Sequence, residues 1–282
     1  MLDLFSPMSP EAQRANRVAY RGYLIERDGE LDIAKRTLSR REANMARFDK
    51  PLSRIREIDR VRFEAQSARF SPDRSLSSEE LLLLALVRLN SAEAYGVERT
   101  VDYARHRAAT GPDEIELLVH VEESYHTRIL LSSAVLYGMR IDTPFKPSQG
   151  LRAMILGIAK APEVVARPLI LAGEIVGTLI FLEILHAARD ILRHDAELRD
   201  AVEERISDVL VDEIGHISFN RMLLGHAGLQ RAKLVLPIVA EVVAQTLPAL
   251  GALGLRPSAR GGSCVTSSDR LPDFVRRSAF VV

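Results

Sequence analysis

The sequence predicts an all-α protein, and three observations lead to this fold class. Apolar residues recur three and four positions apart through long stretches rich in Leu, Ala, Val, Glu and Arg, as they do on the buried faces of helices. The regular alternation that is typical of β-strands is hard to find. Of the 282 residues, 47% are hydrophobic, which is ample for a buried core between long helices.

The same patterns divide the chain into a core and two extensions. Residues 1–76, rich in Arg and Glu, are predicted to form a helical extension that packs on the core. Residues 77–228 are predicted to form a four-helix bundle, and residues 229–282 an additional apolar helix followed by a loosely ordered tail. The four bundle helices are expected at about 77–109, 112–137, 162–193 and 196–224.

Local signals justify these boundaries. The serines and glutamates at 77–80 suit the positive start of the first helix, where hydroxyl groups cap and acidic groups are favoured. Pro112 suits the first turn of the second helix, and Gly138 ends it. A short helix is expected at 151–160, and Gly225 ends the fourth long helix.

Composition excludes several classes of partner. With 38 basic and 38 acidic residues the formal net charge is zero, so no overall field favours nucleic acid. The single Cys264 excludes an intramolecular disulfide and, with no signal peptide evident, favours the cytoplasm. The apolar stretch 168–185 contains Glu174 and Glu183, which would be costly inside a lipid bilayer, so it is predicted to be a buried core helix.

Two short motifs carry the candidate chemistry. Glu123-Ser-Tyr-His126 and Glu213-Ile-Gly-His216 each place a carboxylate and an imidazole three residues apart, which is one turn apart on the same helix face. Both motifs lie on apolar stripes, where an unpartnered ionised carboxylate would be costly and a divalent metal would remove that cost. The motifs are therefore predicted to be metal-chelating pairs.

Each motif is preceded, thirty residues earlier, by a single glutamate in an apolar helical run: Glu93 and Glu183. A helix of about 25 residues and a turn fill that distance, so each glutamate is expected to lie level with its motif. Glu98 is the alternative to Glu93, on a more mixed face of its helix. Glu174 is the alternative to Glu183, on a different face of the same helix. The order Glu, Glu-x-x-His, Glu, Glu-x-x-His is that of a bundle holding two metal ions.

Three further residues are candidate supports of the ligands. Metal-bound imidazoles usually give their other N–H to a carboxylate. In an antiparallel bundle, Asp212 is positioned to serve His126, and Glu122 to serve His216. His186, in a third Glu-x-x-His, is a candidate additional ligand or supporting residue.

The residues named above resemble the ferritin-like di-iron carboxylate superfamily, and its oxygen-activating enzymes more than its iron-storage proteins. The string Asp212-Glu213-x-x-His216-Ile-Ser-Phe is also similar to the bacterial p-aminobenzoate N-oxygenase type. That type has an additional histidine ligand one turn before the last motif glutamate, where this chain has Val209. Unless His186 substitutes for that histidine, the ligand set is closer to the four-carboxylate, two-histidine arrangement of hydroxylases, desaturases and related oxidases.

The resemblance implies an oxygenase or oxidase that binds two iron ions, takes electrons from an external donor and uses O2 to oxidise a small organic molecule, by hydroxylation or N-oxygenation. Manganese is the alternative metal, and a peroxidase, manganese catalase or iron-storage protein is the alternative function. Apolar helices outside the core favour a homodimer. Small or apolar residues one turn from the ligands are candidate walls of a substrate cavity: Gly96, Val97, Thr127, Leu130, Val176, Ile180 and Val209.

Overall fold

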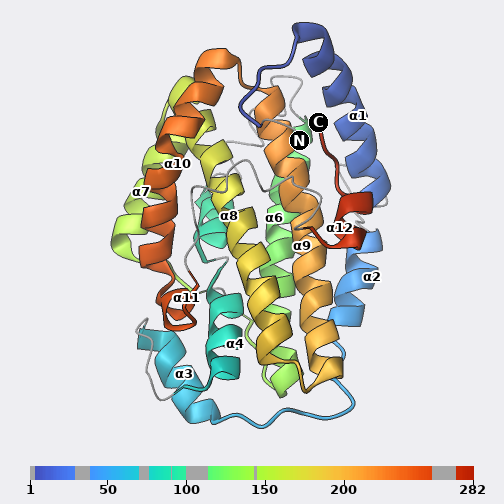
Figure 1. Cartoon of the computed structure of the whole chain (residues 1–282), viewed down its shortest axis with the longest axis vertical. Helices are drawn as coiled ribbons and strands as arrows, with labels where there is room; N and C mark the ends of the chain where they lie inside the picture. The colour runs from blue at the N-terminus through green and yellow to red at the C-terminus, as the bar shows by residue number, and fades with distance from the viewer. Residues whose placement is uncertain are drawn as a thin grey trace.

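Every regular element that the structure describes is a helix, so the all-α prediction is confirmed (Figure 1). The computed structural model describes residues 4–28, 39–69, 76–89, 91–99, 114–142, 145–255 and 271–282. Residues 91–99 are helical. The other helices are α1 (Pro10–Asp28), α2 (Ser39–Phe48), α3 (Arg60–Arg69), α4 (Ser78–Leu89), α6 (Glu114–Ser132), the 3-10 helix η1 (Ser133–Tyr137), α7 (Gln149–Lys160), α8 (Glu163–Ile191), α9 (Ala196–Met222), α10 (His226–Thr246), α11 (Pro248–Ala252) and α12 (Asp273–Ser278).

Helix ends lie close to the positions that the local signals predict. Ser77 and Glu80 form a capping box at the start of α4: the Ser77 hydroxyl accepts from the Glu80 N–H at 3.2 Å, and the Glu80 carboxylate accepts from the Ser77 N–H at 2.8 Å. Gly138 ends η1 with φ of +64°, a left-handed conformation that glycine adopts without strain. The end predicted for the first core helix lies outside the described residues.

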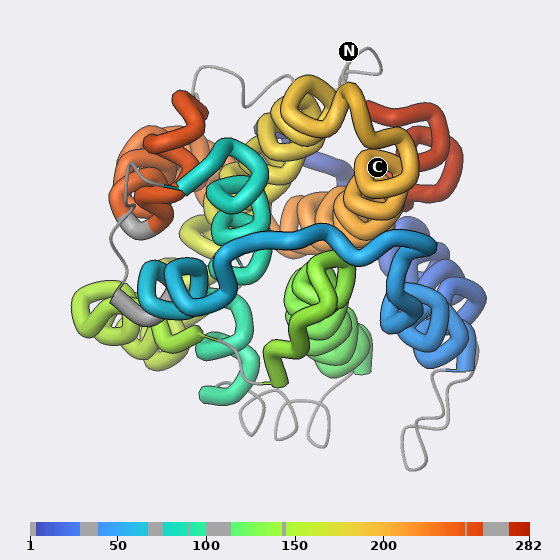
Figure 2. Tube along the Cα trace, turned by 90° about the horizontal axis from the view of Figure 1, so that it is seen from below, coloured from blue at the N-terminus to red at the C-terminus, as the bar shows by residue number. Residues whose placement is uncertain are grey.

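Helices α8 and α9 form the centre of the molecule (Figures 1 and 2). They are joined by residues 192–195, a connection short enough to make them antiparallel neighbours. α10 packs along α8, α6 packs on α9, and α4 contacts both α6 and α8. α4, α6, α8 and α9 therefore surround one interior, and α6 and α9 carry the two motifs.

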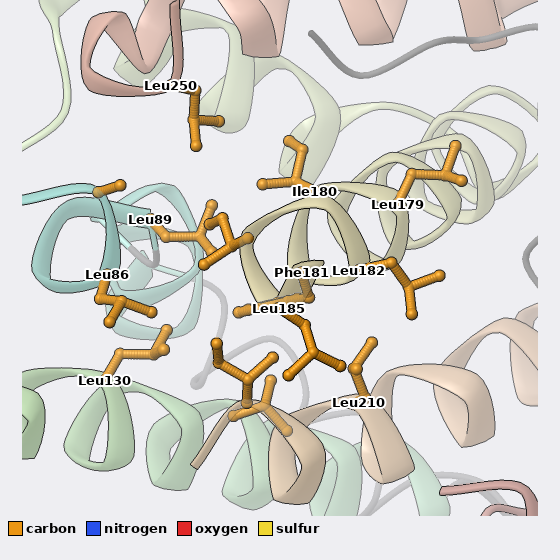
Figure 3. Packing of buried hydrophobic residues seen from close by; sticks show 14 of the residues in the cluster. Leu86, Leu89, Leu130, Leu179, Ile180, Phe181, Leu182, Leu185, Leu210 and Leu250 are labelled. Atoms are coloured by element: carbon orange, nitrogen blue, oxygen red, sulfur yellow. The ribbon is translucent and has the colours of Figure 1, made fainter. Parts of the chain in front are cut away.

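Much of the core between these helices consists of aliphatic side chains. Figure 3 shows side chains of α4, α6, α8 and α9 meeting around Phe181, which is completely buried. Such interiors are close-packed and exclude water. Any polar side chain that this interior holds therefore needs a partner within the protein or a bound ion.

α8 is long and apolar enough to cross a membrane by length and composition alone. Of its most apolar 18 residues, 67% are buried inside the structure. This is the environment of a core helix, in agreement with the sequence interpretation of 168–185.

α1, α2 and α12 pack on the outer side of α9 and α6. α1 contacts α9, α2 contacts α6, and α12 contacts α9. The ring of Tyr20 on α1 stacks on Phe219 of α9 and makes a tilted contact with Phe280 near the C-terminus, with ring centroids 5.6 and 5.0 Å away. The aromatic contacts attach both ends of the chain to the helix that carries Glu213 and His216.

Candidate metal centre

The two predicted chelating pairs meet in the interior, one from α6 and one from α9. His126 Nδ1 lies 3.4 Å from Glu123 on its own helix and 3.2 Å from Glu213 on α9. His216 Nδ1 lies 2.9 Å from Glu123, across the interface. Each imidazole thus faces both motif glutamates, and both histidines are completely buried.

A third and a fourth glutamate complete the cluster: Glu93 from the helical segment 91–99 and Glu174 from α8. The ligand atoms fall into two groups, in each of which all atoms lie within 4.8 Å of one another. The first group is Glu93, Glu123, His126 and Glu213, and the second is Glu123, Glu174, Glu213 and His216. Glu123 and Glu213 belong to both groups, so each can offer one oxygen to either side.

Glu183, the glutamate that the sequence analysis preferred on the third helix, belongs to neither group, and Glu174 takes the place predicted for it. The turn between α8 and α9 explains the correction. Glu174 lies 17 residues before the end of α8, and Glu213 lies 17 residues after the start of α9, so the two are level in the hairpin. Glu183 is nine residues further along α8, about 14 Å away along the helix axis.

Two other sequence candidates also lie away from the cluster. His186 is exposed on α8, beyond Glu183, and belongs to neither ligand group. Glu98 is exposed and pairs with Arg99 at 3.2 Å. The even spacing of thirty residues was misleading for α8 because it ignored where the helix ends.

Several buried ligand atoms in this cluster have no hydrogen-bond partner within the described part of the chain. They are Glu93 Oε2, Glu123 Oε2, Glu213 Oε1, His126 Nδ1 and His216 Nδ1. Buried polar atoms are normally paired, so five unpaired ligand atoms facing one interior fit a site that binds a cation. The cluster has four carboxylates and two imidazoles, whose combined charge two divalent ions would balance if the imidazoles are neutral. The residues therefore fit a metal centre, and the cluster can hold a metal ion.

Burial and the neighbouring charges shift the pKa values of several groups in the cluster. Burial, reinforced by the charges of Glu123 and Glu213, raises the pKa of Glu93 and of Glu174 well above the usual range. Burial opposes charge on His126 and His216, but the carboxylates around them outweigh it and raise the pKa of both imidazoles. Metal binding is therefore expected to release protons.

The opposite nitrogen of each imidazole meets a carboxylate, as the sequence analysis expected. His126 Nε2 lies 3.0 Å from Asp212 on α9, and His216 Nε2 lies 3.0 Å from Glu122 on α6. With Nδ1 facing the glutamates, Nε2–H is the donor in both contacts. Each helix thus supplies the carboxylate that orients the histidine of the other helix, which fixes the ring for metal binding.

Two arginines of the N-terminal extension complete this arrangement, and the sequence analysis did not identify them. Arg41 of α2 contacts both Asp212 and Glu122 and donates to Asp28 at 2.7 Å. Arg27 of α1 contacts Asp212 too. A signal was present for Arg41, since it shares the buried stripe of α2 with Met45 and Phe48, where a charged residue is unusual.

The predicted cavity walls lie on the helices that carry the ligands. Leu130, Val176, Ile180 and Val209 are fully buried, Thr127 is buried, and Gly96 and Val97 are partly exposed. Figure 3 shows Leu130 and Ile180 among the packed aliphatic side chains. Gly177, which the sequence analysis did not name, lies where an added Cβ would be 3.9 Å from Glu213 Oε2. The role of these residues as walls of a substrate cavity stays a prediction.

Comparison of the chain with family models, with curated proteins and with solved structures found no match. The geometry of the carboxylate–histidine cluster is therefore what supports a function for this chain.

Proposed function

We propose that this protein is a ferritin-like di-iron enzyme that uses O2 to oxidise a small organic molecule, with electrons from an external donor. The observation that carries the proposal is the pair of ligand groups sharing Glu123 and Glu213. It supports the proposal because a di-iron bundle takes a single glutamate from each of two helices and Glu-x-x-His from each of two others, all projecting inward. Segment 91–99, α8, α6 and α9 supply those four contributions.

The ligand types favour iron over the harder cations. Each group combines three carboxylates with one imidazole, a mixed oxygen and nitrogen set that suits iron or manganese better than calcium or magnesium. Bound iron would supply the redox chemistry through which O2 oxidises the substrate. The protein contributes orientation of the ligands and a dry surrounding, since Val176 and Val209 beside the site are completely buried.

The test is anaerobic loading of the whole chain with Fe2+, followed by exposure to O2 with a chemical reductant. We expect about two tightly bound ions per chain, the number that this ligand arrangement holds. The amount of O2 consumed should follow the amount of reductant supplied. A mixed panel of amines, carboxylic acids and aromatic compounds should contain molecules that gain an oxygen atom from labelled O2. The matched control is the same protein loaded with Zn2+, which should bind without consuming O2.

Other outcomes would contradict the proposal in different ways. Iron accumulating far beyond two ions per chain would indicate storage. Preferential Mn2+ binding with disproportionation of hydrogen peroxide would indicate a catalase, and consumption of peroxide by the iron form without oxygen insertion would indicate a peroxidase. Absence of metal binding would overturn the ligand assignment itself.

A further inference from the structure

One guanidinium group contacts the supports of both histidine ligands. Arg41 contacts Asp212, which holds His126, and Glu122, which holds His216. Its Nη2 is also 3.1 Å from the second oxygen of Asp212, and its Nε donates to Asp28 at 2.7 Å. Arg41 is the described residue that joins the two imidazole–carboxylate pairs into a single network.

This network is buried, so its charges depend on one another. The side chains of Arg41, Glu122 and Asp212 are 3%, 1% and 0% exposed. Removing one partner from a buried ion pair leaves an uncompensated charge, which is strongly unfavourable. Arg27 supplies a second cation, but it pairs with Asp212 and Asp208 and leaves the Glu122 side to Arg41.

We propose that Arg41 is a positioning residue that sets the orientation of both histidine ligands at once, which makes the N-terminal extension part of the metal centre. The inference rests on the proposed metal function. The planar guanidinium donates in several fixed directions and can hold Asp28, Asp212 and Glu122 together. A lysine ammonium at this position would keep the charge without that fork.

The test compares Arg41→Gln and Arg41→Lys with wild type by Co2+ titration, following both affinity and the visible absorption of bound Co2+, which reports ligand geometry. We expect Arg41→Gln to weaken Co2+ binding about 10- to 100-fold, as changes to the partner of a metal ligand do. Arg41→Lys should bind Co2+ more tightly than Arg41→Gln does but less tightly than wild type does. The spectrum of its bound Co2+ should differ from that of wild type.

The matched control is Arg47→Gln on the same helix, whose exposed side chain pairs with Glu204 of α9 at 2.9 Å. It removes a contact of α2 without touching the network, so its Co2+ affinity and spectrum should equal those of wild type.

Wild-type Co2+ affinity and spectrum in both Arg41 variants, even with lower thermal stability, would overturn the inference and leave the metal site intact. If Arg41→Gln does not fold, the Co2+ affinity and spectrum of Arg41→Lys, compared with those of wild type, test the inference by themselves. Failure of wild type to bind Co2+ would overturn the metal site and this inference together.

A second, independent observation concerns the exposed stripe of α10. Leu234 and Ile238 are 75% and 64% exposed, on the same side of the helix as the exposed Arg231 and Glu241. Arg231 donates to the backbone oxygen of Val164 at 3.2 Å, which places the exposed apolar start of α8 beside the stripe. The stripe thus has two exposed apolar side chains at its centre and opposite charges at its two ends.

The stripe is self-complementary about position 236. Reversing the helix direction around that position exchanges Leu234 with Ile238 and Arg231 with Glu241. We infer that α10 pairs antiparallel with α10 of a second copy of this chain, across a two-fold axis. Such an isologous interface brings apolar residues together at its centre and places each Arg231 opposite Glu241 of the second copy, at both ends.

The oligomeric state of the full chain, measured by sedimentation at low salt, tests this inference. Wild type should be a dimer, Leu234→Glu a monomer, and Arg231→Glu and Glu241→Arg weaker dimers because like charges then face each other. The double variant Arg231→Glu/Glu241→Arg should recover the dimer. Val61→Glu is the control, since Val61 is 80% exposed on a different helix, α3. A monomeric wild type, or a dimer unaffected by Leu234→Glu, would overturn the inference.

Discussion

Replacing Glu213 by Ala is expected to abolish tight binding of both metal ions. Glu213 belongs to both ligand groups and lies 3.2 Å from His126, so the substitution would remove a carboxylate from each group. The affinity should fall by more than the roughly 10- to 100-fold that is typical when only the partner of a ligand is changed. Metal analysis after equilibrium dialysis against Fe2+ under anaerobic conditions measures the effect.

Glu174 and Glu183 provide the controls for this result, because they lie on the same helix. Glu174 belongs to one ligand group, so Glu174→Ala should lower the content from about two ions to about one. Glu183 belongs to neither group, so Glu183→Ala should retain both ions. Loss of metal from Glu183→Ala but not from Glu174→Ala would show that α8 lies in a different register against α9.

Tyr20→Ala is expected to cost about 3–5 kcal/mol of unfolding free energy, the range for removing a large buried aromatic side chain. Tyr20 is completely buried between Phe219 and Phe280. Its ring closely approaches Gly215, where an added Cβ would lie 3.2 Å from the tyrosine oxygen. The truncation would leave a cavity between α1, α9 and the C-terminus. Urea unfolding of the metal-free protein measures the effect.

Tyr20→Phe separates packing from polarity at the same position. The Tyr20 hydroxyl is buried without a hydrogen-bond partner among the described residues, and a buried polar group without a partner is unfavourable. The phenylalanine variant should therefore be as stable as wild type or more stable. A loss similar to that of Tyr20→Ala would instead mean that the hydroxyl has a partner, and the metal content of the variant would show whether that partner is connected to the metal centre.

The helices and the ligand types could be predicted from the sequence because both are local properties. Three-residue spacing on a helix places Glu123 beside His126 and Glu213 beside His216 whatever surrounds them. The crossed contacts of Asp212 with His126 and Glu122 with His216 could also be inferred, since they follow from two antiparallel helices facing each other with their motifs level.

The tertiary structure decided which distant residues meet those motifs. Glu174 replaced Glu183 because the position of the turn between α8 and α9 sets the level of each residue, and an apolar stripe does not distinguish faces on a helix that is buried on most sides. Arg41 is far from the motifs along the chain, and only the packing of α2 against the core brings its guanidinium to Asp212 and Glu122. Helical periodicity is thus fixed by neighbours along the chain, whereas the register between helices and the pairing of buried charges depend on how the whole interior is filled.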